Sequence, residues 1–512
     1  MATEAHRPAK HCTDTMNDES NKIIKTRWLY TAQQSRDIDR MLIEQTPVSG
    51  YELMQSAGCA CFSRLIKQWH QAHNIVVFAG SGNNGGDGYV IARLLRLAER
   101  NVKVCQLGDA NHIKGEALEA RTAYLQAGGE IISLDESIKA DLFVDAIFGS
   151  GLNRDLSEEA CRWIDYINTQ ATAVLAVDIP SGLDADRGCA RPIAVKADIT
   201  VSFITRKQGM YTAAGKDYCG RIFFEALQDI DDIALQFKPT YRLLNHTEAL
   251  QCLPPRRCDT HKKNFGHVLV AGGNHGMAGA VCLAAKAALH SGAGLVSVLT
   301  QTQHITTVTA VCPPLMVHDA AHPEAVKRLI HNCDIIVIGP GLGSDAWALA
   351  LMSEVLDSDK KLVVDADALH LLAKEPLTSN RWILTPHPGE AAHLLNTTTR
   401  EIQQDRFSAA LKIQDRYGGV CVLKGAGTLV ADTAQTTVCE GGNAGMSSAG
   451  MGDVLSGVIA SLQAQGLSMT NAATLGTCIH AHAGDLAAAN TPRGLTADVV
   501  IDHLRDALNN GE

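Results

Sequence analysis

The sequence predicts an α/β protein with two doubly wound domains, and three observations support this fold class. The chain has 512 residues, which is too long for one ordinary hydrophobic core. Short apolar runs alternate with helical segments in two separate series, as buried parallel strands and their crossover helices do. Between the two series, residues 228–263 interrupt the alternation and include Pro239, Pro254 and Pro255. No internal repeat of fixed period is found, so the halves share a class but not a repeated unit.

The first series predicts a domain over residues 27–238. It should begin with a helical segment over residues 31–70 that breaks near Pro47 and Gly50. The predicted strands are residues 75–79, 102–107, 142–148, 173–177 and 199–203, and the predicted helices between them are residues 89–100, 112–127 and 157–169. Residues 1–26 are polar and mixed in charge, so we expect a disordered tail there.

The second series predicts a domain over residues 239–512. Its expected strands are residues 268–271, 295–299, 334–338, 362–365, 382–384 and 420–423. Two helices, at residues 453–465 and 471–489, should follow them.

Charge and composition limit the kinds of molecule that the protein is expected to bind. The formal net charge of −10 argues against a nucleic-acid or anionic-membrane surface. The 15 cysteines are scattered without a C-x-x-C motif, which favours reduced thiols over a disulfide framework or a zinc site. No apolar run approaches the roughly 20 residues that span a bilayer. We therefore expect a cytoplasmic protein with neither a nucleic-acid nor a membrane partner.

A glycine-rich loop follows the first predicted strand of the first domain. Residues 80–85 satisfy G-x-G-x-x-G, and Asp109 lies about 20 residues further on, where a ribose-binding acid could sit. A dinucleotide-binding Rossmann fold is therefore a fair interpretation, although the motif alone is weak. Asn83, Asn84 and Asp87 add polar side chains to a loop in which a plain phosphate cradle needs only glycine backbone.

Two further strand ends in this domain carry carboxylates, Asp145 and Asp178. Ligands of an open parallel sheet bind outside the carboxyl ends of its strands, so these acids should converge with Asn84 and Ser181. Amide, carboxylate and hydroxyl oxygens suit a hard cation. The alternative is that each acid simply caps the helix or turn that follows it.

Together the segments GSGNNGGDG, VDAIFGSGL and DIPSGLDAD resemble the Rossmann-like, amino-terminal YjeF-type NAD(P)H-hydrate epimerase domain over residues 27–228. The resemblance implies inversion of carbon 6 of a hydrated nicotinamide ring, and we expect Asp178 to act as its acid or base. It also implies a potassium ion held by Asn84, Asp145 and Ser181. The residues implied to contact the hydrated nucleotide are Asn83, Asn84, Gly85, Gly86, Asp87, Gly149, Ser150, Gly151, Leu152, Asn153, Arg154, Asp155 and Asp178. Ser150 stands where the family often has threonine.

In the second domain, the segment NAGMSSAGMGDVLS over residues 443–456 ends in Asp453 at the start of a predicted helix. Gly450 and Gly452 allow a tight turn, and the free amides of a helix start attract a phosphate. A carboxylate at this point can take the proton from an attacking hydroxyl. The alternative is a glycine-rich helix entry with Asp453 as a simple N-terminal charge.

Six further segments precede this one, at residues 260–273, 276–280, 339–343, 364–369, 385–390 and 424–428. No G-x-x-x-x-G-K-[ST] occurs, which disfavours a P-loop nucleotidase. His387, Glu390 and His393 could suggest a metal, but two prolines oppose the single helix that zinc spacing requires. His480 and His482 lie two apart on a predicted helix and are expected to be packing or surface residues.

These segments, in this order, are similar to the ribokinase-like ADP/ATP-dependent NAD(P)H-hydrate dehydratase over residues 241–503. The resemblance implies that Asp453 deprotonates the ring hydroxyl, which attacks the terminal phosphate beside a magnesium ion before the phosphate ester is eliminated. Ala280, Gly343, His387 and Asp453 should contact the hydrate. The residues implied to bind ADP are Lys424, Gly425, Ala426, Gly427, Thr428, Asn443, Ala444, Gly445, Met446, Ser447, Ser448, Ala449, Gly450, Met451 and Gly452. Ala449 stands where glycine is commoner.

The combined expectation is a bifunctional repair enzyme. It should interconvert R and S forms of NADHX and NADPHX and dehydrate the S form, with ADP favoured because the fused layout resembles bacterial forms. We also expect a homo-oligomer. The alternatives are a ribokinase-like kinase acting on a vitamin precursor and fused to a nucleotide-binding module, or a first domain that serves as a binding scaffold.

Overall fold

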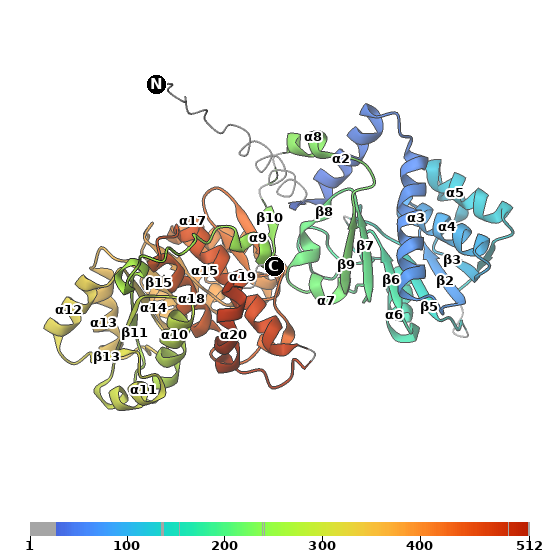
Figure 1. Ribbon diagram of the computed structural model, residues 1–512. Helices are drawn as coiled ribbons and strands as arrows, with labels where there is room; N and C mark the ends of the chain where they lie inside the picture. Colours follow the sequence, from blue (N-terminus) through green and yellow to red (C-terminus); the bar gives the residue numbers. More distant parts are fainter. Residues whose placement is uncertain are drawn as a thin grey trace, which may run out of the picture. The chain divides into compact units, whose positions relative to one another are not determined.

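The computed structural model describes residues 27–134, 138–152, 154–237, 239, 241–489 and 491–509. The chain divides into two compact units, the first up to Met210 with Ala214–Arg242, and the second comprising Tyr211–Ala213 and the chain from Leu243 onward. Each unit has a parallel sheet with helices on both faces, which confirms the predicted class (Figure 1). The predicted tail over residues 1–26 lies outside the described residues.

The first unit contains a seven-stranded sheet in the order β4-β3-β2-β5-β6-β7-β9, and every neighbouring pair is parallel. Its strands are β2 (Asn74–Ala79), β3 (Asn101–Gln106), β4 (Glu130–Ile132), β5 (Leu142–Ala146), β6 (Val174–Val177), β7 (Ile199–Phe203) and β9 (Arg221–Glu225). The strand order changes direction between β2 and β5, which creates a switch point. All five predicted strands are confirmed, whereas the short β4 and the partly exposed β9 were not predicted.

Helices cover both faces of this sheet. The helices of the unit are α2 (Ala32–Gln45), α3 (Gly50–Gln68), α4 (Asn83–Leu97), α5 (Gly115–Gln126), α6 (Glu158–Gln170), α7 (Gly215–Cys219) and α8 (Asp231–Ala234). Of these, α2 and α8 pack together in a separate apolar cluster. Ile75 and Val77 pack with α3, α4 and α5, while Val76 and Phe78 pack on the other face with Trp163 of α6. The predicted break between α2 and α3 is confirmed, and Ser49 caps α3.

Three further short strands pair with one another. They are β1 (Trp28–Tyr30), β8 (Arg206–Lys207) and β10 (Tyr241–Leu244). β1 pairs antiparallel with the start of β10 and parallel with β8, and it brings Tyr30 beside Lys207.

The sheet of the second unit has the order β13-β12-β11-β14-β15-β16-β17-β18-β19. Strands from β13 to β17 are parallel, and β17, β18 and β19 form antiparallel pairs. The bounds are β11 (His267–Ala271), β12 (Leu295–Thr300), β13 (Met316–Asp319), β14 (Ile335–Ile338), β15 (Lys361–Val364), β16 (Trp382–Leu384), β17 (Val420–Leu423), β18 (Leu429–Ala431) and β19 (Thr436–Cys439). The six predicted strands are confirmed, and β13, β18 and β19 were not predicted.

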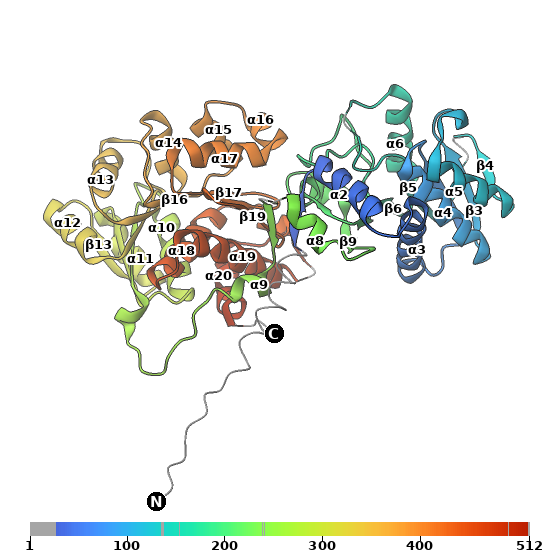
Figure 2. The same ribbon diagram turned by 90° about the horizontal axis from the view of Figure 1, so that it is seen from above.

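Helices α14, α15 and α17 lie on one side of this sheet, and α10, α18, α19 and α20 lie on the other (Figure 2). The helices of the unit are α9 (His246–Leu250), α10 (Ala278–His290), α11 (Ile305–Val311), α12 (Pro323–Asn332), α13 (Ala346–Leu356), α14 (Ala366–Lys374), α15 (Pro388–Leu395), α16 (Thr399–Gln404), α17 (Arg406–Tyr417), α18 (Met451–Ala464), α19 (Met469–Ala488) and α20 (Ala497–Asn509). The helix predicted from residue 453 therefore begins two residues earlier. Gly457 of α18 packs closely on α10, because a Cβ there would lie 2.0 Å from the Ala284 carbonyl oxygen.

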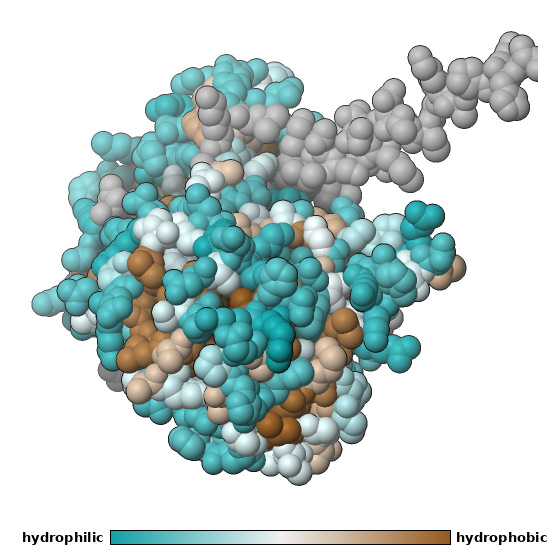
Figure 3. Space-filling view, turned by 90° about the vertical axis from the view of Figure 1, so that its left-hand side faces the viewer, coloured by the Kyte–Doolittle hydropathy of each residue, from teal (hydrophilic) through white to brown (hydrophobic). Residues whose placement is uncertain are grey.

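The surface of the face shown in Figure 3 is largely hydrophilic, with separate apolar patches. Exposed large apolar side chains of the second unit include Val311 and Leu349. Scattered residues of this kind are ordinary on globular proteins. No helix within the described ranges combines the length and the hydropathy that a bilayer span requires.

The contact between α10 and α18 gives a stability prediction. Replacing a glycine inside a helix by alanine usually raises the free energy of unfolding by about 1 kcal/mol. Gly457→Ala should instead lower it by about 1–3 kcal/mol, because the new methyl group overpacks the interface between α10 and α18. Gly279→Ala is the matched control, since a Cβ at Gly279 in the first turn of α10 meets no atom within 4 Å. Calorimetry should show a lower melting temperature for Gly457→Ala only. Equal or higher melting temperatures for both variants would contradict this account.

Candidate active sites

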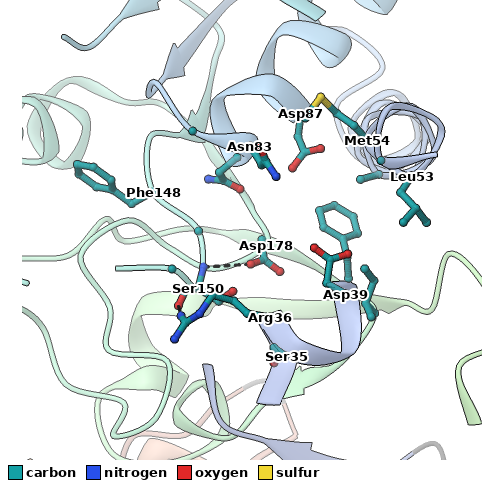
Figure 4. Close-up of a pocket in the computed structure, with 18 of the residues that line it drawn as sticks. Ser35, Arg36, Asp39, Leu53, Met54, Asn83, Asp87, Phe148, Ser150 and Asp178 are labelled. Atoms are coloured by element: carbon teal, nitrogen blue, oxygen red, sulfur yellow. Dashed lines mark hydrogen bonds between the residues drawn. The ribbon is translucent and has the colours of Figure 1, made fainter. Parts of the chain in front are cut away.

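A cavity of about 480 Å³ lies in the first unit at the carboxyl ends of β2, β5 and β6 (Figure 4). This is the switch point of the sheet, where ligands of doubly wound folds bind, and pockets for small molecules typically measure about 300–1,000 Å³. Nine predicted contact residues line it, namely Asn83, Asn84, Asp87, Gly149, Ser150, Gly151, Leu152, Arg154 and Asp178. Gly85, Gly86 and Asp155 are not among the lining residues, and Asn153 lies outside the described part of the chain.

Residues 83–87 form the first turns of α4, so the prediction of a polar loop over these residues was wrong. The glycines of this segment lower helix propensity, but packing of the helix against the sheet overrides that preference. A Cβ at Gly85 would lie 2.0 Å from the Gly80 carbonyl oxygen, so only glycine allows this approach. Asp109 caps a short 3₁₀ turn by accepting from the Asn111 amide and does not line the cavity, so nothing supports its predicted ribose contact.

Asp178 is held at the end of β6 by contacts on both of its carboxylate oxygens. Its backbone adopts a left-handed φ of 66°, which is uncommon outside glycine. Oδ2 accepts a hydrogen bond from the Ser150 amide at 3.2 Å, and Oδ1 forms an ion pair with Lys207 Nζ. Lys207 is only 2% exposed and also donates to Ser202 Oγ at 3.2 Å and to the Phe203 carbonyl at 2.9 Å. The sequence analysis missed Lys207, although its position just after a predicted strand was a usable signal.

Three more acidic residues line the same cavity, namely Asp39, Asp87 and Glu116. Burial, with added repulsion from Asp178 and Asp39, raises the pKa of Asp87 well above its usual value, and the Lys207 ammonium opposes this shift. Burial also raises the pKa of Asp39. Asp39 was not predicted, because α2 carries no motif and reaches the cavity only through tertiary folding.

Of the predicted cation ligands, Asn84 lines this cavity, whereas Asp145 and Ser181 are fully buried and do not line it. The Asp145 carboxylate accepts two hydrogen bonds from Ser181. One comes from the Ser181 backbone amide at 2.7 Å and the other from the Ser181 hydroxyl group at 2.6 Å. Burial raises the pKa of Asp145 to about 6, although the Ser181 hydrogen bonds lower it. The Asn84 side chain is buried, and among the described residues neither its oxygen nor its nitrogen has a hydrogen-bond partner. Asn84 borders Gly149, and the neighbouring Phe148 amide donates to Ser181 Oγ, so the three predicted ligands surround one loop.

A second cavity, of about 390 Å³, lies in the second unit at the carboxyl ends of β15, β16 and β17 and at the start of α18. Seven predicted residues line it, namely His387, Lys424, Gly425, Ser448, Gly450, Gly452 and Asp453. The other predicted contacts are not among its lining residues, namely Ala280, Gly343, Ala426, Gly427, Thr428, Asn443, Ala444, Gly445, Met446, Ser447, Ala449 and Met451.

Asp453 lies in the first turn of α18, behind a left-handed Gly450 with φ of 87° that begins the helix. Burial, together with the nearby Asp365 carboxylate, raises the pKa of Asp453 to about 7, and Lys424 opposes this shift. A carboxylate with a pKa near neutrality is a suitable general base. The amides of the helix start lie in the same turn, where they favour an anion.

Lys424 links the carboxylates of this cavity. Its Nζ lies 2.7 Å from Asp365 Oδ1 and 3.6 Å from Glu390 Oε2. Asp365 also accepts from Ser456 Oγ at 2.6 Å, and Lys424 lowers the pKa of Asp365 although burial opposes this. A Cβ at Gly452 would lie 3.0 Å from Lys424 Nζ, so the ammonium lies at the start of α18. Asp365, Glu390 and Ser456 were not predicted as site residues.

His387 caps the helix α15 and lines the cavity. Its Nδ1 accepts from the Gly389 amide at 2.9 Å, while its own amide donates to Glu390 Oε2 at 2.7 Å. His393 instead packs edge-on against the ring of His370. The three residues that could have suggested a metal therefore have separate structural roles, and the described residues contain no group of three metal-ligating side chains.

Two of the predicted residues outside the second cavity, Gly343 and Asn443, form hydrogen bonds with residues near it or behind it. The Gly343 amide donates to Asp367 Oδ2 at 2.8 Å, and the charge of Asp367 contributes to the raised pKa of Asp453. The Asn443 side chain donates to the Gly484 carbonyl at 3.0 Å and to Asp485 at 2.9 Å, which anchors the glycine-rich segment to α19.

Both sites place buried carboxyl groups beside glycine-rich helix starts at the carboxyl ends of parallel strands, which defines a two-site α/β enzyme that handles nucleotides. A family model described as YjeF-related protein N-terminus matches residues 50–209, and one described as NAD(P)H-hydrate dehydratase matches residues 268–506. A ribokinase-like superfamily protein of Enterococcus faecalis, solved by crystallography, matches with a TM-score of 0.50 at 27% identity, covering 53% of this chain and 96% of that protein.

Curated relatives match almost the whole chain. The bifunctional NAD(P)H-hydrate repair enzyme Nnr of Coxiella burnetii is 43% identical over 485 residues, covering 94% of this chain and 99% of the relative. The enzyme of the same name from Escherichia coli is 39% identical over 503 residues, covering 96% and 97%. The chain belongs to the family of bifunctional NAD(P)H-hydrate repair enzymes, as the two resemblances in the sequence indicated.

The raised pKa of Asp453 predicts how nucleotide-dependent turnover varies with pH. A carboxyl group with a pKa of about 7 is protonated below that pH and cannot accept a proton, so kcat/KM should rise tenfold per pH unit below about 7 and level off above it. The measurement is kcat/KM between pH 5.5 and 8.5 at saturating nucleotide. A flat profile over this range would contradict the assignment of Asp453 as the base.

Proposed function

We propose that this chain repairs hydrated nicotinamide nucleotides at two sites. The first unit interconverts the R and S forms of NADHX and NADPHX. The second dehydrates the S form to NADH or NADPH at the expense of ADP, which gives AMP and phosphate. The observation that carries the proposal is that a chain aligned almost end to end with these enzymes has a carboxylate-lined cavity in each matched domain.

In the second unit, Asp453 takes the proton from the hydroxyl group of the hydrate, and the oxygen attacks the terminal phosphate of the nucleotide. The amides at the start of α18 favour the charge that develops on the transferred phosphate. Lys424 lies between Asp365 and Glu390, where it lowers the pKa of Asp365 and offsets part of the negative charge near the phosphates. The phosphate ester then leaves by elimination, which restores the reduced ring.

We propose that residues 424–428 and 443–452 hold the adenine nucleotide. The support is that Lys424, Gly425, Ser448 and Gly450 line one cavity with Asp453. Ala280, Gly343 and His387 are proposed to contact the hydrate. A magnesium ion would accompany the nucleotide phosphates, since this ion usually combines one or two carboxylates with phosphate oxygens.

In the first unit, Asn84, Asp145 and Ser181 would hold potassium, which would neutralise a buried charge near the substrate. The residues fit such an ion, because a buried carboxylate has no cationic partner among the described residues and the neighbouring Asn84 oxygen has no donor. An oxygen-rich set of this kind suits a hard cation. The residues proposed to bind the hydrated nucleotide are those of the two loops, 83–87 and 149–155, with Asp178.

The proposal is tested with purified protein and separated NADHX epimers. The S epimer with ADP and magnesium should regain the absorbance of NADH, and the R epimer should do so at an enzyme-dependent rate when potassium is present. If NADH absorbance returns neither with ADP nor with ATP, the proposed dehydratase activity is rejected. If the R epimer is consumed at the same rate without the enzyme, the proposed epimerase activity is rejected. A stable phosphorylated product would indicate a kinase instead.

Asp453→Asn should reduce dehydration at least about 100-fold while leaving ADP affinity within about twofold, because the amide keeps the shape and loses the base. Asp502→Asn in α20 is the matched control, since its acid is exposed and pairs only with Lys286 on the surface. Turnover is measured by NADH absorbance and ADP affinity by calorimetry. Loss of ADP binding in Asp453→Asn would mean that this residue serves the nucleotide rather than the proton.

Asp145→Asn should abolish the potassium activation of epimerisation, because the neutral amide removes the charge that a cation would balance. Dehydration of the pure S epimer in the same variant is the internal control and should not change. The measurement is the epimerisation rate against potassium concentration. An unchanged potassium response would place the ion elsewhere.

A further inference from the structure

The first cavity contains more ionisable groups than the predicted cation and substrate contacts account for. Asp39 from α2, Asp87 from α4, Asp178 after β6 and Lys207 from β8 all line it. In Figure 4 the carboxyl groups of Asp39, Asp87 and Asp178 are turned toward the same space. Glu116, Arg36 and Arg154 also line the cavity, so four acids face three cationic side chains. An acidic excess remains, and the acids of the cavity cannot all ionise at equal cost.

The acids of this cavity differ in their partners. Asp178 has the Lys207 ammonium on one oxygen and the Ser150 amide on the other, so both oxygens of its carboxyl group accept from a donor. Asp87 has no hydrogen bond or ion pair on its carboxyl group within the described ranges. Burial and its acidic neighbours raise its pKa well above the usual value, which favours its protonated form. One cavity therefore presents a carboxylate and a carboxylic acid, the combination that separates an acid role from a base role.

We propose that epimerisation uses Asp87 as the general acid and Asp178 as the general base, with Lys207 as the positioning residue that keeps Asp178 ionised and oriented. This assignment rests on the proposed function of the first unit and adds the proton path to it. The ion pair of Lys207 is with Asp178, and its ammonium also donates to two neutral oxygens, those of Ser202 and Phe203. Its charge also opposes the raised pKa values of Asp39 and Asp87.

The proposed step balances in atoms and electrons. Asp87 donates its proton to the hydroxyl oxygen at carbon 6, and the C–O bond breaks with its electron pair on the departing water. The lone pair of the ring nitrogen forms a C=N bond and leaves a cation. A water molecule then bonds to the opposite face of carbon 6 while Asp178 takes its proton. The net change is inversion at carbon 6 and transfer of one proton from Asp87 to Asp178. That proton then returns from Asp178 to Asp87 through solvent.

A carbon that bears both a ring heteroatom and a hydroxyl group loses that hydroxyl most easily when a neutral acid protonates it and an anion stabilises the cation. Inverting glycosidases solve the same problem with one protonated and one ionised carboxyl group on opposite faces of the ring. Asp87 at the start of α4 and Asp178 at the end of β6 come from different walls of this cavity.

The test uses the full chain with variants Asp87→Asn, Lys207→Met and Lys207→Arg. Lys103→Met is the matched control, because Lys103 forms an exposed ion pair with Glu130 away from the cavity. Epimerisation of R-NADHX is followed by chromatography in ¹⁸O-labelled water, and mass spectrometry of the product shows whether the new epimer carries a solvent oxygen. An enzyme-free reaction gives the spontaneous rate.

Asp87→Asn should lower kcat about 100-fold or more, the usual effect of removing a general acid. Lys207→Met should lower kcat by a similar factor with KM within about twofold, and Lys207→Arg should recover most of the loss because it restores the charge. The wild-type product should carry one solvent oxygen per inversion. Retention of the original oxygen, or wild-type kcat in Asp87→Asn or Lys207→Met, would overturn the assignment. If the wild-type protein itself fails to epimerise, the proposed function fails instead.

Discussion

Both sites depend on the way a parallel sheet gathers the carboxyl ends of its strands at one edge. In the first unit β2, β5 and β6 end beside one another at the point where the strand order reverses. In the second unit the adjacent strands β15, β16 and β17 end beside one another, and the strand order reverses between β11 and β14. Residues far apart in the sequence, such as Asp365 and Lys424, therefore meet without any local motif that joins them. The tight approach of α4 at Gly85 brings a helix start to the edge of the first sheet, and Gly457 lets α18 pack closely on α10. Free amides at a helix start can meet a phosphate or a polar ring.

The two cavities share an electrostatic arrangement although their folds are not repeats. Each pairs a buried lysine with a carboxylate, Lys207 with Asp178 and Lys424 with Asp365. In each, a further acid lacks that partner and has a raised pKa, Asp87 in one and Asp453 in the other. A lysine that pairs with one carboxylate increases the difference in proton affinity between that carboxyl group and the second, unpaired one in the same cavity. Acid–base chemistry near neutral pH requires such a difference.

Strands with long apolar runs and strand-end acids could be predicted from the sequence, because burial on both faces of a parallel sheet leaves a clear pattern. The helical state of residues 83–87 could not, since glycine propensity opposes it and only packing against the sheet decides the outcome. Lys207 and Asp39 were missed for a different reason. They lie on a two-residue strand and on a motif-free helix, and only tertiary folding brings them to the cavity.

Among the described residues, those that line the first cavity all belong to the first unit, and those that line the second all belong to the second. The covalent linkage therefore need not complete either centre. What it guarantees is stoichiometry: one ribosomal product delivers both centres in equal number. A cell that makes them on one polypeptide keeps their ratio constant without matching the expression of two genes.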